Sequence, residues 1–165
     1  MKFLLTVVFA VFLVGGVSGC LKIQGEPCEC PNFMSLREKY PDDHDMFFTQ
    51  HAGCSANATC VGYSRFILKW NDTTIPIPGD AHARGYFWTR TFDSSPPAPK
   101  VPRELFAFFG IVCENKNWYI TKYPYGIGYY ISGTGSRNVT STGYQEEYQG
   151  KKTMFNRSFV CHPYS

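Results

Sequence analysis

The sequence predicts a mainly β fold, a small antiparallel sheet domain stapled by disulfides, with at most one short helix near the N-terminus. Eleven tyrosines and fourteen phenylalanines, with few helical stripes, favour strands. Several stretches alternate apolar and polar residues, as strands with one buried face do. Seven cysteines follow an apolar leader, which indicates bridges formed in an oxidising compartment.

Residues 1–19 are predicted to be a signal peptide. Lys2 supplies a basic start, residues 3–14 form an apolar run, and Val17-Ser18-Gly19 offers small residues before a cleavage point. The run is short for a membrane span, and a retained signal anchor is the alternative. No second apolar stretch of spanning length follows, so we expect residues 20–165 to form a single secreted domain with no membrane attachment after cleavage.

The formal net charge of the chain is +3 at pH 7, and its basic residues are scattered along the sequence. A charge this small, without a basic run, argues against a nucleic acid or an anionic membrane as partner. The expected partner is therefore an extracellular ligand of unknown identity.

Six cysteines are predicted to form three disulfides, namely Cys28, Cys30, Cys54, Cys60, Cys113 and Cys161. Cys28 and Cys30 are too close in sequence to bridge each other without strain, so each needs a distant partner. The pairing is otherwise open. A zinc site would call for paired Cys-x2-Cys or His-x3-His spacings, and the sequence has none, so we expect no metal and no cofactor.

The seventh cysteine, Cys20, has no predicted partner. It is free, it links two chains into a dimer, or it carries lipid, because residues 17–20 also resemble a bacterial lipobox. Four Asn-x-Ser/Thr sequons favour a eukaryotic secretory route instead, at Asn57, Asn71, Asn138 and Asn156. We therefore predict a secreted glycoprotein.

The first expected element is a short helix over Phe33–Tyr40, opened by Asn32 and stopped by Pro41. From Thr59 the pattern becomes that of a strand. Alternate residues are predicted to face the core, namely Cys60, Gly62, Ser64, Phe66, Leu68 and Trp70. This inward direction makes Cys60 a plausible partner for Cys113.

Residues 75–79 (IPIPG) are expected to form a loop, because prolines cannot sit inside a sheet. Arg84–Thr91 is a second alternating strand. Asp93–Pro102 is a polyproline-like connection. It is either a linker between two lobes or a surface loop of one domain, and we favour one domain because neither half has many residues with which to enclose a core.

Leu105–Tyr123 is expected to be the centre of the fold. Two apolar runs flank the polar residues 114–117, which is the pattern of a hairpin with a four-residue loop. In that register Cys113 lies opposite Trp118 and Ile111 opposite Ile120. A tryptophan packed on a half-cystine would form a dry core nucleus.

Three further segments complete the chain. Tyr123–Ser132 is predicted to be a strand with one thin, glycine-lined face, and Asn138–Gly150 a loose polar stretch. The last strand is Thr153–Cys161, with Phe155 and Cys161 on the face opposite to the Asn156 sequon.

Two groups of residues are candidates for chemistry. The imidazoles and carboxylate of His44, Asp45 and His51 could serve a small hydrolase or a metal site. A solvated acidic loop over residues 42–45 is the simpler interpretation, because the sequence has no Gly-x-Ser-x-Gly or His-Glu-x-x-His motif and no group placed to complete a triad.

The second group is Arg84, Tyr86, Trp88 and Arg90, which share one face of a predicted strand. Flat rings flanked by guanidinium groups can stack on sugars, bases or anions, and carbohydrate is one candidate ligand. The simpler interpretation is an outer face whose arginine stems cover the rings. The tyrosine-rich Tyr123–Tyr130 could likewise form a sugar-binding patch, or pack in the core.

Short motifs around the cysteines resemble nematode secreted cysteine-rich domains of unknown function. They are residues 53–54 (GC), 58–60 (ATC), 110–113 (GIVC), 118–120 (WYI) and 159–161 (FVC). The resemblance spans Cys54–Cys161 and implies an extracellular disulfide domain with no established activity. The prediction is thus a non-enzymatic extracellular binding or defence-type protein, with the hydrolase as the alternative.

Overall fold

The structure is a computed structural model that describes residues 27–38, 46–82, 86–91, 101–131, 139–141, 148, 150–156 and 159–162. Over 139–141 it describes the backbone alone. Several predictions fall outside these ranges: those for the signal segment, Cys20, Arg84, Asn138, the acidic residues 42–45 and most of the proline-rich connection.

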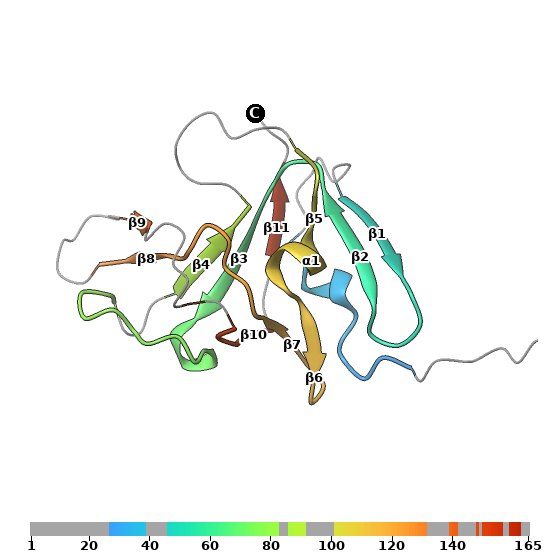
Figure 1. Ribbon diagram of the computed structural model, residues 1–165, viewed down its shortest axis with the longest axis horizontal. Coiled ribbons are helices and arrows are strands. Elements are labelled where there is room, and N and C mark those ends of the chain that lie inside the picture. The colour runs from blue at the N-terminus through green and yellow to red at the C-terminus, as the bar shows by residue number, and fades with distance from the viewer. Residues whose placement is uncertain are drawn as a thin grey trace, which may run out of the picture.

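The mainly β prediction is confirmed, since the described chain forms three antiparallel sheets (Figure 1). Their strand orders are β1-β2-β5, β10-β7-β6 and β11-β3-β4-β8-β9. The strands are β1 (Met46–Gln50), β2 (Ala56–Cys60), β3 (Tyr63–Lys69), β4 (Tyr86–Arg90), β5 (Arg103–Glu104), β6 (Val112–Glu114), β7 (Asn117–Ile120), β8 (Gly128–Tyr130), β9 (Val139–Ser141), β10 (Thr153–Phe155) and β11 (Phe159–His162).

The short N-terminal helix is a single 3-10 turn, η1 (Phe33–Leu36). The Asn32 side chain caps it by accepting a hydrogen bond from the Met34 amide at 2.9 Å. A second 3-10 turn, η2 (Trp70–Asp72), follows β3.

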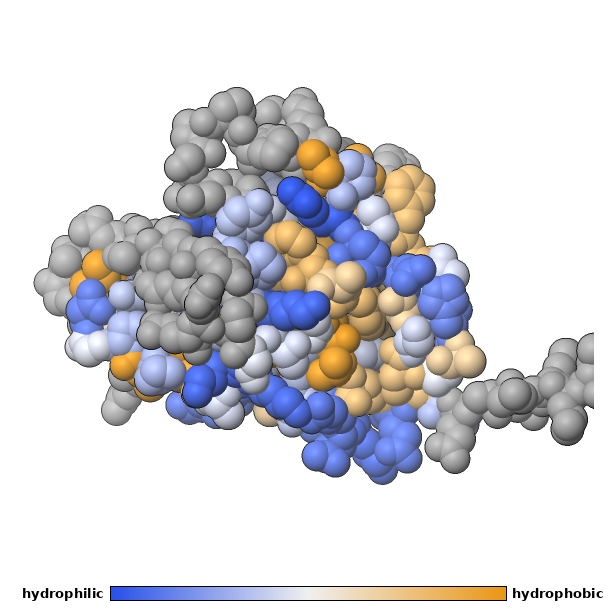
Figure 2. Space-filling model, viewed as in Figure 1, coloured by the Kyte–Doolittle hydropathy of each residue, from blue (hydrophilic) through white to orange (hydrophobic). Residues whose placement is uncertain are grey.

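The one α-helix of the described residues is α1 (Leu105–Phe109), and it occupies a run that we expected to belong to the hairpin. Glu104 explains the difference, because its carboxylate accepts hydrogen bonds from the amides of Phe106 and Ala107 and so caps the first turn. Gly110 ends the helix at φ 58°, in the left-handed region. In Figure 2 hydrophobic side chains gather over α1, whereas the tip of the β6–β7 hairpin is hydrophilic.

The hairpin register is confirmed, since Cys113 pairs with Trp118. The loop is shorter than expected. Glu114 pairs with Asn117, so only Asn115 and Lys116 turn the chain, and both have positive φ values, 49° and 64°. Two residues of this kind make the tight turn whose twist suits a hairpin.

Two predicted strands are each divided in the structure. The alternation along β3 is confirmed, with Ser64, Phe66 and Leu68 buried, but Cys60 ends β2 in another sheet. The stretch expected as one last strand, Thr153–Cys161, separates into β10 and β11, which also lie in different sheets. In addition, β9 lies in the stretch predicted to be loose.

All six predicted cysteines form disulfides, as Cys28–Cys54, Cys30–Cys113 and Cys60–Cys161. The predicted pairing of Cys60 with Cys113 is wrong. Cys60 leaves the end of β2 beside the start of β3, which pairs with β11, so its partner is Cys161. The two longer bridges span 83 and 101 residues. Because a cross-link restricts the unfolded chain more as the loop it closes becomes longer, these two should stabilise the fold more than Cys28–Cys54 does.

The core joins all three sheets around Phe33, whose side chain is 1% exposed. Five rings surround it at centroid distances of 4.8 to 6.0 Å, those of Phe48, Phe106, Trp118, Phe155 and Phe159. The Trp118 indole also donates a hydrogen bond to the Pro31 carbonyl at 2.8 Å. The segment before β1 is therefore an integral part of the core.

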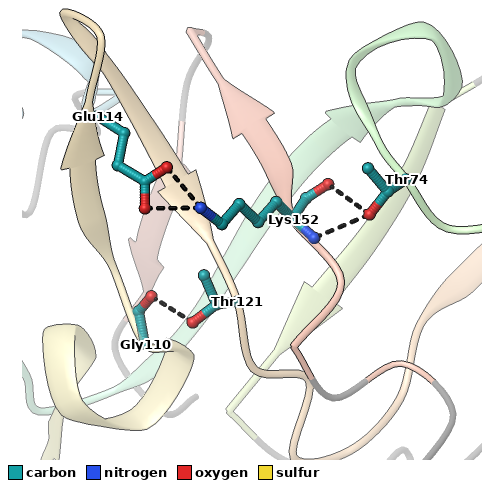
Figure 3. Close-up of polar contacts among 5 residues, drawn as sticks. All are labelled: Thr74, Gly110, Glu114, Thr121 and Lys152. Atoms are coloured by element: carbon teal, nitrogen blue, oxygen red, sulfur yellow. Dashed lines mark hydrogen bonds and ion pairs between the residues drawn. The ribbon is translucent and has the colours of Figure 1, made fainter.

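Polar contacts connect the β10-β7-β6 sheet to the segments around it and link its outer strands to each other (Figure 3). Before β10, the Lys152 amide donates to the Thr74 hydroxyl at 3.0 Å, while its ammonium pairs with the Glu114 carboxylate. Both charged side chains are well exposed, so this ion pair contributes little to stability. The Thr121 hydroxyl, directly after β7, donates to the Gly110 carbonyl at 2.8 Å and so attaches the C-terminal end of α1 to the end of that strand.

Tyr123 adds a buried hydrogen bond between its hydroxyl and that of Thr153, at 2.6 Å. Burial raises the pKa of Tyr123 far above its usual value, against a smaller opposing effect of the Thr153 hydrogen bond. Because the pKa is higher in the folded chain, the phenol stays neutral there, and its contribution to stability is lost only as the pH rises past the unfolded value of about 10.

Gly110 and Gly150 offer a matched test of how α1 is held. Both have positive φ, but an added Cβ at Gly110 would lie 2.3 Å from the Thr121 hydroxyl oxygen, whereas at Gly150 it would meet nothing within 4 Å. We expect Gly150→Ala to lower the free energy of unfolding by about 1 kcal/mol, the strain of the left-handed backbone. Gly110→Ala should cost about 2 kcal/mol more, since the Thr121 bond must break. Urea unfolding measures both, and equal losses would contradict the contact.

Candidate functional site

The surface of greatest chemical interest is the side of the five-stranded sheet that faces away from the core, which we call the outer face. Along β3 the even-numbered residues are buried and the odd-numbered ones half-buried. Residues paired across antiparallel strands share one side of the sheet, and the registers then define the outer face. It comprises Tyr63, Arg65, Ile67 and Lys69 of β3, Tyr86, Trp88 and Arg90 of β4, Gly128 and Tyr130 of β8, and Val160 and His162 of β11.

Aromatic rings occupy one end of the outer face. Tyr86 and Tyr130 are 39% and 37% exposed, while Trp88, which pairs with Gly128, is only 6% exposed. The Trp88 ring meets the Tyr130 ring edge to face, with centroids 5.2 Å apart. It also lies directly against Gly128, where an added Cβ would be 2.4 Å from the indole Nε1. The absence of a side chain at Gly128 thus lets the indole lie against β8, beside Tyr130.

Cationic side chains occupy the centre of the same face. Arg65 and Arg90 are directly opposite each other on β3 and β4, and Lys69 is opposite Tyr86. Like charges in directly opposed positions destabilise a sheet. Within the described part of the chain, the Arg65 Nε is shielded from solvent and has no hydrogen-bond partner. This combination leaves an N–H donor with positive charge around it and no acceptor.

The structure therefore brings together three of the four residues predicted to bind a ligand, Tyr86, Trp88 and Arg90. Trp88 is nevertheless buried, so Tyr86 and Tyr130 provide the exposed stacking surface. Arg65 and Lys69 were not predicted to bind a ligand, although they alternate with the core-facing residues of their strand. The same alternation that put Phe66 inside puts both cations outside.

The tyrosine-rich stretch contributes one tyrosine to this face, Tyr130. Tyr123 and Tyr129 are buried in the core. The Tyr129 hydroxyl donates to the Asp80 carboxylate at 3.3 Å. Burial, and then the charge of Asp80 and this hydrogen bond, raise the pKa of Tyr129, so it too remains a neutral donor.

Of the predicted hydrolase group, the structure describes His51 alone. His51 is exposed after β1, and its backbone amide donates to the Ser55 carbonyl at 2.9 Å. In this part of the chain no side chain is hydrogen-bonded to its imidazole. His44 and Asp45 lie outside the described ranges, and their arrangement with His51 stays a prediction.

Four cysteine sulfurs form a further cluster. The Sγ atoms of Cys28, Cys30, Cys54 and Cys113 all lie within 4.8 Å of one another, as two neighbouring disulfides. Sequence spacing did not reveal the cluster, because its members come from positions up to 85 residues apart; the one local signal was Cys28-x-Cys30.

A protein-family model described as TRA-1 regulated protein R03H10.4 matches residues 26–160. The chain belongs to this family. No curated protein and no solved structure matches the chain. The match covers the segments of all three sheets, and it is consistent with the expected nematode domain of unknown function. Within the described ranges of this TRA-1 regulated family member, no helix is long and apolar enough to span a membrane.

In this member of the TRA-1 regulated family, Gly128 keeps the outer face in shape. Gly128→Ala would drive a methyl group into the Trp88 ring, and we expect a loss of about 1–3 kcal/mol in the free energy of unfolding together with a changed tryptophan fluorescence. Gly79→Ala is the matched control, since its Cβ meets nothing within 4 Å, and it should stay within about 0.5 kcal/mol of the parent. Equal losses in the free energy of unfolding for the two variants would disprove the contact between Gly128 and Trp88.

Proposed function

We propose that the protein is a secreted, N-glycosylated and non-enzymatic binding module whose outer face binds an acidic carbohydrate. The observation that carries the proposal is the Arg65 side chain, directly opposite Arg90, whose Nε is shielded from water and has no acceptor among the described residues. An anionic group from a ligand that reaches this guanidinium would supply an acceptor and place negative charge beside the two arginines.

The arginine pair favours a carboxylate or a sulfate as the group bound. Guanidinium groups present planar sets of N–H donors that match such anions in a bidentate way. A facing pair of arginines costs the sheet about 0.2–1 kcal/mol in the free protein. A bound anion would offset this repulsion, so ligand binding would recover the free energy that the repulsion costs the free protein.

The tyrosines favour a sugar as the body of the ligand. Tyr86 and Tyr130 present exposed rings near the Trp88 indole, and Lys69 faces Tyr86 across the strands. Rings with one apolar face and a polar hydroxyl suit the alternating apolar and hydroxylated surfaces of a sugar.

Secretion and glycosylation have their own support. Three disulfides suit an oxidising compartment. The asparagines of three sequons, Asn57, Asn71 and Asn156, are exposed, and none of them belongs to β3, β4 or β8. Glycans at these positions would be attached outside the strands that make the outer face. The family description names no activity, so the proposal depends on the outer face itself.

The protein is expressed in eukaryotic cells and purified from the medium, and its binding to polysaccharides is measured. Recovery from the medium tests secretion, and a fall in mass on N-glycosidase treatment tests glycosylation. Heparin, chondroitin sulfate and hyaluronan are the probes, with neutral dextran as reference. We expect the acidic polymers alone to bind. Arg65→Gln with Arg90→Gln should weaken binding about tenfold or more, the loss of two charge-assisted contacts. Its free energy of unfolding should not fall, because a like-charge pair is removed.

Lys116→Gln with Lys151→Gln is the control, since it removes the same charge from two exposed lysines away from the outer face. It should change affinity less than twofold. Equal weakening by the two double variants would mean that the polymers respond to overall charge alone. The absence of binding to every acidic polymer would refute the proposed ligand class.

A further inference from the structure

The four clustered sulfurs, which form two disulfides, lie close enough together to bind a metal ion when they are reduced. Cys28 and Cys30 precede η1, Cys54 lies in the turn between β1 and β2, and Cys113 lies in β6. All four Sγ atoms are within 4.8 Å of one another. We propose that, once the two disulfides are reduced, these four sulfurs bind a single zinc ion as thiolates.

The spacing is close to that of a zinc site. A tetrahedral zinc ion holds thiolate sulfurs at about 2.3 Å, which places the sulfurs about 3.8 Å apart. The unbonded sulfurs would move inward by about 1 Å at most, and the bonded ones would separate to the same distance. An all-thiolate set selects soft ions such as zinc over magnesium or calcium.

Neighbouring groups hold the ligands in position. Cys113 faces Trp118 across the hairpin, and the Trp118 indole donates to the carbonyl of Pro31, the residue after Cys30. Cys30 is itself buried. These contacts do not depend on the disulfides, so the sulfurs of Cys30 and Cys113 are expected to stay near each other when their bond is broken.

Disulfides and zinc exclude each other at this site. Each disulfide takes up two electrons and two protons to give two thiols; with a trialkylphosphine as reductant, the phosphine becomes its oxide with an oxygen from water. Zinc then displaces the four thiol protons. Dioxygen oxidises the four thiolates back to two disulfides, taking their four electrons and four protons from water to give two water molecules, and the ion is released. The redox state of the cluster thus decides whether metal is held.

The remaining disulfide provides a built-in comparison. Cys60 and Cys161 are buried together, and among the described residues no third potential ligand lies with them. Removing this pair leaves the cluster complete, whereas removing Cys28 and Cys54 leaves only two of its four ligands. Both double variants keep four of the six paired cysteines.

The experiment uses the full secreted protein, reduced by a trialkylphosphine without oxygen and titrated first with Co²⁺ and then with Zn²⁺. We expect one Co²⁺ per chain, with the intense visible bands and the thiolate-to-metal charge-transfer band of a tetrahedral sulfur site, displaced by one equivalent of Zn²⁺. Cys60→Ser with Cys161→Ser should keep the spectrum. Cys28→Ser with Cys54→Ser should weaken Co²⁺ binding by on the order of a hundredfold.

Near-ultraviolet circular dichroism follows folding in the same samples, because Trp118 lies beside Cys113. Metal that binds the cluster should restore part of the tryptophan signal lost on reduction. A reduced chain that binds no Co²⁺, whether it is folded or not, overturns the proposal. Equal Co²⁺ affinity in the two double variants would also overturn it, since the ion would then be held by cysteines in general.

Discussion

The packing of aromatic rings around Phe33 is the interaction on which the other parts of the structure depend. The rings in contact with it come from β1, α1, β7, β10 and β11, so one side chain touches all three sheets and the helix. Phe33 belongs to a single 3-10 turn that would not be stable alone. The disulfides of Cys28 and Cys30 attach the chain just before this turn to the β1–β2 connection and to the hairpin. Covalent cross-links and ring packing therefore support each other.

This core also determines which surface is left for recognition. The inner side of the five-stranded sheet supplies Phe66 and Phe87 to the core, and the strict alternation of a strand then turns Arg65 and Arg90 outward. Two arginines that face each other are unfavourable for the sheet, and this is why the outer face is the best candidate for a ligand. The sulfur cluster, which joins the segment before η1 to the β1–β2 turn and to β6, is a second chemically reactive feature.

Local patterns predicted the fold well where one rule dominated. The alternation along β3 and the Cys113–Trp118 register both follow from the period of a strand. Prediction failed where two local signals competed and where distant contacts decided the outcome. Leu105–Phe109 is apolar enough for a strand, but the neighbouring Glu104 carboxylate caps it as a helix. Pairing of Cys60 with Cys161 depends on strand order, which no local pattern contains. The same limit concealed the position of Arg65 opposite Arg90 and the sulfur cluster.

The most direct test of this account is the free energy of unfolding of Phe33→Ala, measured by urea titration with the disulfides intact. We expect a loss of about 3–5 kcal/mol, because the cavity left behind lies where all three sheets meet. Phe47→Ala, which truncates a ring that is 66% exposed on β1, should change the value by no more than about 0.5 kcal/mol. A loss of less than about 1 kcal/mol for Phe33→Ala would contradict its central role.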